Sequence, residues 1–173
     1  MIQVYTYISL LILLVVPKTV ITQDVVLTEK RERNAFGIPC TEFYFDITVP
    51  PIPARKVIVR RFLPKGKSEG NVLLTAGGTG GGFYSATYGK QSQIFIDSLL
   101  QNDIAVWDIM YDEPNGWSEN CEGIGSYHKA VEIYAVLVKF LYNNHFENTD
   151  KVFATGNSGG SFQIAFALAE FDL

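Results

Sequence analysis

Residues 156–160 read GNSGG and form the pattern G-x-S-x-G around Ser158. The apolar residues 151–155 before this pattern predict a strand, and residues 161–170 after it predict a helix. A sharp turn from strand to helix presents its central serine to solvent, where the hydroxyl can attack a carbonyl carbon. The pattern therefore predicts a nucleophile at Ser158, with an ordinary glycine-rich turn as the alternative interpretation.

The glycines of this pattern have separate expected roles. Gly156 and Gly160 lack a Cβ atom, so they are expected to let the strand and the helix approach each other closely. Ser158 is expected to adopt a strained backbone conformation between them. The N–H group of Gly159, directly after the serine, is the predicted donor to the oxyanion of a tetrahedral intermediate.

A second glycine-rich loop spans residues 77–82 and follows an apolar stretch at 71–76 that predicts a buried strand. Acyl transfer requires backbone N–H groups that point at the developing oxyanion. Gly78 and Thr79 are the candidates for one such donor, and the residues alone do not choose between them.

Phosphate binding is the alternative function for this loop, and two motif tests argue against it. The Walker pattern fails because Tyr84 stands at its first glycine and Gln91 at its Ser/Thr position. The dinucleotide pattern fails because Phe83 occupies the last glycine position. Phe83, Tyr84 and Trp117 are candidates for the mouth of an active site, or else ordinary core or surface aromatics.

The elements that must position these loops follow from hydrophobic periodicity. Residues 41–49 alternate as a half-buried strand does, and residues 56–62 follow after a proline-rich segment, which predicts an antiparallel start. The remaining predicted strands are 71–76, 104–111 and 151–155, and the predicted helices are 93–101, 127–141 and 161–170. Alternation of strands and helices predicts the α/β class, with a mostly parallel sheet and flanking helices.

From residue 41 onward, this order of elements and the GNSGG turn resemble the α/β-hydrolase family. The resemblance implies a serine hydrolase that acts on small-molecule or lipid carboxylic esters, with no metal and no organic cofactor. Members of the family often carry a His-Gly pair in the glycine loop, where this chain has Ala76-Gly77. A backbone amide is the donor there, so the missing histidine leaves the expectation intact.

The resemblance also implies a triad in the chain order serine, acid, histidine. After Ser158 come Glu170 and Asp172 but no histidine. The acid, the histidine and the later strands are therefore expected beyond Leu173. Residues 23–173 are interpreted as a C-terminally truncated α/β-hydrolase domain that is inactive alone, because a serine without its base is a poor nucleophile.

Two histidines precede the serine, and neither is predicted to complete a triad. His128 falls on the polar side of the helix at 127–141, and His145 falls in the turn after that helix.

Two alternative functions remain to be weighed. GNSGG differs by one residue from the GDSGG of trypsin-like peptidases, but alternating strands and helices disagree with the all-β barrels of those enzymes. A non-catalytic hydrolase-like binding module is the other alternative, although the intact serine and glycines favour an enzyme.

Composition limits the partners. The chain has 173 residues, of which 47% are hydrophobic and 18% charged, as expected for one folded domain. Its formal net charge of −4 provides no basic surface, which argues against nucleic acid or anionic lipid as a partner.

The N-terminal residues 1–22 predict a signal peptide and hence a secreted, extracellular protein. The uncharged apolar run at 8–16, ended by Pro17, has the length of a signal-peptide core. It is too short for a stable membrane span, which needs about 20 apolar residues. A signal anchor or a misassigned start are the alternatives.

Two cysteines, Cys40 and Cys121, predict one disulfide in an oxidising compartment. Two separate buried thiols are the alternative. The sequence has no cluster of Cys and His residues, so no metal site is expected.

Overall fold

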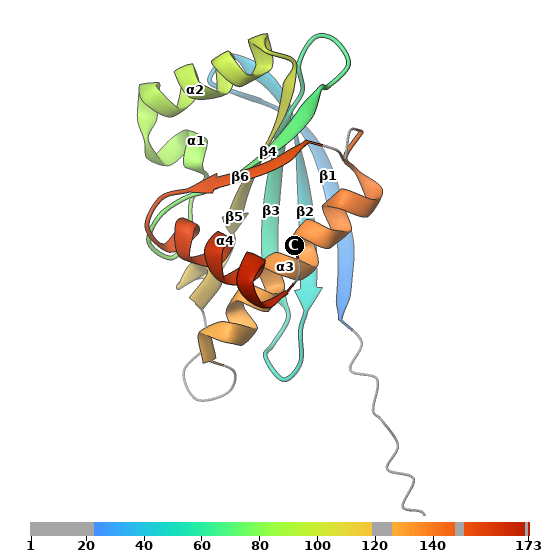
Figure 1. Cartoon of the computed structure of the whole chain (residues 1–173), viewed down its shortest axis with the longest axis vertical. Helices are drawn as coiled ribbons and strands as arrows, with labels where there is room; N and C mark the ends of the chain where they lie inside the picture. The colour runs from blue at the N-terminus through green and yellow to red at the C-terminus, as the bar shows by residue number, and fades with distance from the viewer. Residues whose placement is uncertain (1–22, 119–125, 148–150, 172) are drawn as a thin grey trace, which may run out of the picture.

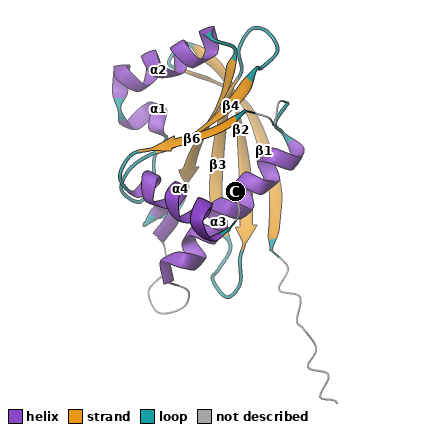
Figure 2. Ribbon diagram, viewed as in Figure 1, coloured by secondary structure: helices purple, strands orange, loops and turns teal. Residues whose placement is uncertain are grey.

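The structure, a computed structural model, describes residues 23–118, 126–147, 151–171 and 173; the signal peptide predicted at 1–22 lies outside these residues. Its centre is a six-stranded sheet in the order β1-β2-β3-β5-β4-β6. Figures 1 and 2 show helices packed on both faces of this sheet, which is the predicted α/β arrangement.

The described elements alternate along the chain as the periodicity predicted, with one additional strand at the start. The strands are β1 (Asp24–Ala35), β2 (Ile38–Thr48), β3 (Arg55–Phe62), β4 (Gly70–Thr75), β5 (Ile104–Tyr111) and β6 (Val152–Gly156). The helices are α1 (Tyr84–Thr87), α2 (Gly89–Gln101), the short 3-10 helix η1 (Gly116–Ser118), α3 (Ser126–Asn144) and α4 (Gly159–Glu170).

The first three strands form an antiparallel meander. β2 pairs with β3 in antiparallel register, as the proline-rich connection predicted, and β3 pairs with β5 in the same way. β1 and β2 form a hairpin closed by Phe36 and Gly37, whose φ angles are 58° and 86°. Positive φ at both central residues is typical of a two-residue hairpin turn that matches the twist of its strands.

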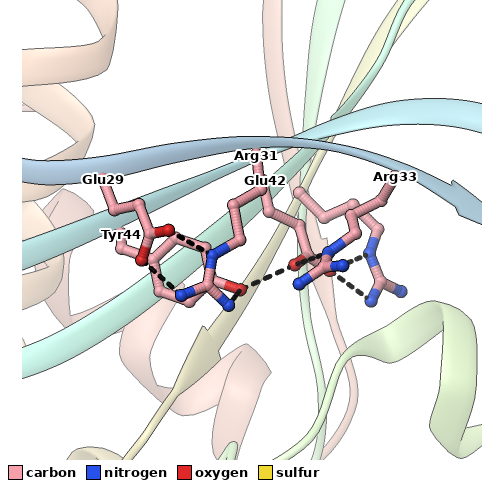
Figure 3. Close-up of polar contacts among 6 residues, drawn as sticks. Glu29, Arg31, Arg33, Glu42 and Tyr44 are labelled. Carbon is pink, nitrogen blue, oxygen red and sulfur yellow. Dashed lines mark hydrogen bonds and ion pairs between the residues drawn. The ribbon is translucent and has the colours of Figure 1, made fainter.

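β1 was not predicted because its charged side chains hide the alternation of a strand, and nearly all of it is exposed. Figure 3 shows how these charges are used across the hairpin. Arg31 forms an ion pair with Glu29, and its guanidinium lies 4.6 Å from the ring centroid of Tyr44. Nε of Arg33 lies 3.5 Å from Oε2 of Glu42. The carboxylate of Glu42 also accepts a hydrogen bond of 2.9 Å from the hydroxyl of Tyr44.

The other half of the sheet is parallel. β4 lies between β5 and β6 and pairs in parallel with both, so that Thr75 is in register with Ile109 on one side and Gly156 on the other. Every residue of β4 is buried. Parallel strands end at the same edge of the sheet, and the loops that follow β4 and β6 therefore lie next to each other.

Two hydrophobic clusters fill the spaces between the sheet and the helices. The larger one lies under α3 and α4 and includes Phe43, Leu73 and Trp107. The smaller one lies under α2 and includes Val72 and Ile96. Neighbouring residues such as Val72 and Leu73 contribute to different clusters because successive side chains of a strand point to opposite faces.

β6 stands last in the strand order, and within the described residues its outer edge pairs with no strand. Phe153 of β6 is 57% exposed. Beside this edge, a groove of about 570 Å³ runs between α3 and α4, with Leu73, Tyr134 and Ile164 among its lining residues.

Cys40 is a buried free thiol that packs in the smaller cluster, and burial raises its pKa. Cys121 lies outside the described residues, so the structure does not support the predicted disulfide. A search of the described residues found no helix that combines the length and the apolar character needed to cross a membrane.

Candidate active site

Ser158 lies in the sharp turn between the end of β6 and the start of α4. Its backbone has φ 50° and ψ −114°, in the left-handed half of conformational space that a residue with a Cβ rarely enters. The side chain is exposed. Ser158 is thus a solvent-accessible residue with a strained backbone between a strand and a helix.

The glycines on either side allow this turn to lie against β4. A Cβ on Gly156 would come 2.5 Å from Oγ1 of Thr75 and 2.8 Å from the backbone carbon of Gly160. A Cβ on Gly160 would come 2.6 Å from the carbonyl oxygen of Thr75. Both distances to Thr75 are too short for real atoms, so this close packing of the turn against β4 requires glycine at both positions.

The glycine loop after β4 reaches the same turn. A Cβ on Gly159 would overlap the carbonyl oxygen of Gly78, which places the Gly78 peptide directly against the residue after the serine. The indole Nε1 of Trp117 donates a hydrogen bond of 3.0 Å to that same carbonyl oxygen. The backbone N–H of Trp117 also donates to the carbonyl oxygen of Thr79, at 2.8 Å. Trp117 therefore holds two consecutive peptides of the loop beside Ser158.

The three predicted oxyanion donors are unpaired in this arrangement. Within the described part of the chain, the N–H groups of Gly78, Thr79 and Gly159 donate to no protein acceptor. The N–H of Gly159 belongs to the first turn of α4, where amides have no partner inside the helix. Unpaired amides near a helix N-terminus favour an anionic group.

Sequence reasoning missed two residues that bind the glycine loop or the helix α1 after it. The carboxylate of Asp108, in β5, accepts hydrogen bonds of 2.8 Å from the N–H groups of both Tyr84 and Ser85 at the start of α1. The hydroxyl of Tyr88, just after α1, accepts a hydrogen bond of 3.0 Å from the N–H of Gly77. A single acidic residue within an apolar strand is a signal that could have identified Asp108.

Burial dominates the electrostatics of Asp108. Loss of hydration raises the pKa of this carboxyl to about 6, although the hydrogen bonds from Ser85 and Tyr84 and the nearby Arg60 guanidinium act in the opposite direction. The carboxyl is therefore mainly ionised at neutral pH, when its acceptor oxygens serve α1 best.

The structure does not bring either histidine to Ser158. The ring of His128 lies 4.9 Å from that of Phe171, by centroids, and the ring of His145 lies 5.1 Å from that of Phe43. Burial, with Arg61 and Lys30 nearby, lowers the pKa of His145.

Of the two acidic residues after the serine, the structure describes only Glu170. Glu170 is exposed at the last residue of α4, and Asp172 lies outside the described residues. The described residues hold no group of three His, Cys, Asp or Glu side chains placed to bind a metal ion.

Aromatic side chains lie on one side of the serine. Trp117 stacks on Phe162 with ring centroids 5.8 Å apart, and Tyr127 lies 5.7 Å from Trp117. Tyr127 is 59% exposed and Phe162 is 43% exposed. Of the predicted mouth residues, Trp117 thus borders the site, whereas Phe83 is buried against the guanidinium of Arg60 at 3.8 Å. We call Trp117, Tyr127 and Phe162 the aromatic wall.

No protein-family model matches the sequence, and a comparison with curated proteins gave no significant match. The fold is similar to that of a cold-adapted esterase from an Arctic intertidal metagenomic library, in its polyethylene-glycol-bound complex. The TM-score is 0.53 at 18% identity, over 82% of this chain and 60% of that one. A dienelactone hydrolase from Anabaena variabilis gives 0.49 at 20% identity, over 77% and 59%.

This chain thus spans about 60% of the length of the esterase. Its mixed six-stranded sheet with helices on both faces has the α/β-hydrolase fold, as the order of elements in the sequence predicted.

Proposed function

We propose that this protein is a serine hydrolase that cleaves carboxylic esters, with Ser158 as its nucleophile. The observation that carries the proposal is one exposed, strained serine that is followed directly by the unpaired amide of Gly159, with the glycine loop after β4 packed against the same turn. An esterase among the proteins of similar fold supports the substrate class.

The reaction follows from this geometry. The Oγ of Ser158 attacks the ester carbonyl carbon and loses its proton to a general base, and the carbonyl oxygen becomes an oxyanion. The N–H of Gly159 and that of Gly78 or Thr79 stabilise this charge, and each such donor contributes roughly 10²–10³ in rate. Collapse of the intermediate breaks the bond to the alcohol oxygen, which takes up the proton, and water then hydrolyses the acyl-serine by the same route.

The general base is proposed to be a histidine that is oriented by an acid. This assignment rests on the family order of serine, acid and histidine, and on the position of His128 and His145 away from Ser158.

Covalent labelling tests the nucleophile directly. The full-length protein should react with a fluorophosphonate and hydrolyse p-nitrophenyl esters, and Ser158→Ala should abolish both reactions. Ser161→Ala is the matched control and should keep both reactions. Ser161 is a nearby exposed serine in α4, and its hydroxyl donates to the carbonyl oxygen of Gly156. A folded protein that neither labels nor turns over ester would be a hydrolase-like binding module instead. Cleavage of peptides at rates comparable to esters would indicate a peptidase.

We also propose that residues 1–22 direct secretion and are then removed, on the basis of the apolar run at 8–16. Expression in a secretory host tests this, since the mature protein in the medium should begin at Gln23. Protein that stays in the membrane fraction with its N-terminus intact would identify a signal anchor.

A further inference from the structure

Polar contacts around Ser85 fix the short helix α1 to the sheet. The N–H of Ser85 donates to the carboxylate of Asp108 at 2.8 Å, and the carbonyl oxygen of Ser85 accepts from the hydroxyl of Ser92 at 2.9 Å. Its own hydroxyl accepts from Arg60 at 3.3 Å. Ser85, Ser92 and Asp108 are each no more than 2% exposed, so water does not compete for these bonds.

Tyr88, the residue that follows α1, links this fixed helix to the glycine loop. Its ring packs against that of Tyr84 with centroids 4.7 Å apart, and its hydroxyl accepts the hydrogen bond from the N–H of Gly77. The position of a Cβ on Gly77 lies 3.0 Å from that hydroxyl and 3.5 Å from Cβ of Ser158. Gly77 is therefore in contact with the tyrosine on one side and the serine on the other.

The carbonyl oxygens of the loop are held by other hydrogen bonds, such as those from Gly80 to Gly77 and from Tyr111 to Gly80. The contact with Tyr88 differs because it holds an amide of the loop. Gly77 immediately precedes Gly78, whose φ of 61° and whose lack of a side chain leave many conformations open to it. Trp117 fixes the carbonyl side of the Gly78 peptide, and Tyr88 fixes the amide of the residue before it. Together the two contacts fix the backbone on either side of the Gly78 N–H, which donates to no acceptor among the described residues.

We propose that Tyr88 is a positioning residue for the oxyanion loop, which holds the amide of Gly77 so that the next amides point at the oxyanion. This inference rests on the proposed function. A residue that positions oxyanion donors acts on the transition state, so its loss should lower kcat and leave KM almost unchanged.

The test compares Tyr88→Phe with Tyr142→Phe. Both substitutions remove one hydroxyl, but Tyr142 is an exposed residue of α3 whose hydroxyl makes no hydrogen bond within the described residues. Tyr88→Phe should lower kcat by about tenfold, less than the roughly 10²–10³ for loss of a whole oxyanion donor, with KM within about twofold. Tyr142→Phe should match the wild type. Equal kcat values for the two variants, or a loss confined to KM, would overturn the proposal.

Amide exchange provides a readout that does not depend on catalysis. In the wild type, the Gly77 amide should exchange more slowly than the unpaired Gly78 amide, and Tyr88→Phe should remove that difference. Equal exchange at the two amides of the wild type would overturn the proposal even if the variant did not fold. If the Gly77 amide exchanges slowly but Ser158 does not label with fluorophosphonate, the proposed function is rejected. The contact between Gly77 and Tyr88 then still stands.

Discussion

The carbonyl oxygen of Gly78 occupies the space that a Cβ on Gly159 would need. These two residues belong to different loops, one after β4 and one after β6, and each carries a predicted oxyanion donor. Their contact means that the site depends on close approach of two peptide backbones, which only glycine permits at this point.

Gly159→Ala adds only one methyl group, but it should lower the activity strongly. The added methyl group collides with backbone, which cannot move aside as a flexible side chain would, so the Gly78 loop or the start of α4 must shift. We expect kcat/KM for p-nitrophenyl acetate to fall by roughly 10²–10³, as for loss of an oxyanion donor. Gly66→Ala is the control, because its nearest neighbour would be Asp103 Oδ1 at 3.6 Å. Equal activity of the two variants would contradict the prediction.

Ser158→Gly should stabilise the protein relative to Ser158→Ala while both abolish activity. A residue with a Cβ at φ 50° and ψ −114° stores roughly 1–3 kcal/mol of strain, and glycine relieves it. Because glycine also loses about 0.5–1 kcal/mol more in backbone entropy, we expect a net gain of about 1 kcal/mol. Urea unfolding of the two variants measures the difference. A glycine variant less stable than the alanine variant would show that the turn is not strained.

Asp108 should make stability depend on pH between about 4 and 6. Its carboxyl keeps a proton in the folded state up to a pKa of about 6, whereas the unfolded chain releases it near 3.8. The unfolded state binds fewer protons in this window, so the contribution of Asp108 to stability falls as pH rises and is constant above it. The fall should be about 3 kcal/mol, since the pKa differs by about 2 between the folded and unfolded states and a difference of one corresponds to about 1.4 kcal/mol.

Unfolding free energies of the wild type and of Asp108→Asn across this pH range isolate that contribution. The difference between the two proteins should change with pH, and the exposed Asp112→Asn control should give no such change. Parallel pH profiles for the wild type and Asp108→Asn would contradict the raised pKa.

Phe162→Ala should change substrate preference. The ring of Phe162 is part of the aromatic wall, and the N–H of this residue donates to the carbonyl oxygen of Ser158 at 3.0 Å. Exposed apolar surface beside a nucleophile binds apolar substrate groups. We expect KM for p-nitrophenyl butyrate to rise about tenfold while KM for the acetate changes less than twofold. Ile94→Ala, which removes another exposed side chain, is the control.

The parallel half of the fold could be predicted because burial leaves a plain signature in the sequence. β4 and β5 are continuous apolar runs, and α3 carries an apolar stripe at helical spacing. β1 has no such signature. Its side chains contact β2 through charges such as Arg33 and Glu42, and charged residues also occur in any solvated loop.

The candidate site likewise has residues that the sequence identifies and residues that it does not. Ser158 and the glycines beside it form a local pattern, so a short window of sequence identifies them. Tyr88, Trp117 and Asp108 act on the site through contacts with residues distant in sequence, for instance between Trp117 and Gly78. No spacing rule relates such residues, because the fold alone brings them together.

The parallel pairing of β4 with β6 also governs when the site is assembled. Thr75 and Thr155 lie 80 positions apart yet are joined by a hydrogen bond at this pairing. Closing so long a loop is slow, and proteins with high contact order fold slowly for that reason. The ribosome adds about 5–20 residues per second. Several seconds therefore pass between the synthesis of β4 with its glycine loop and that of β6. The nascent chain thus acquires its proposed nucleophile only after strands β1 to β5 have been synthesised.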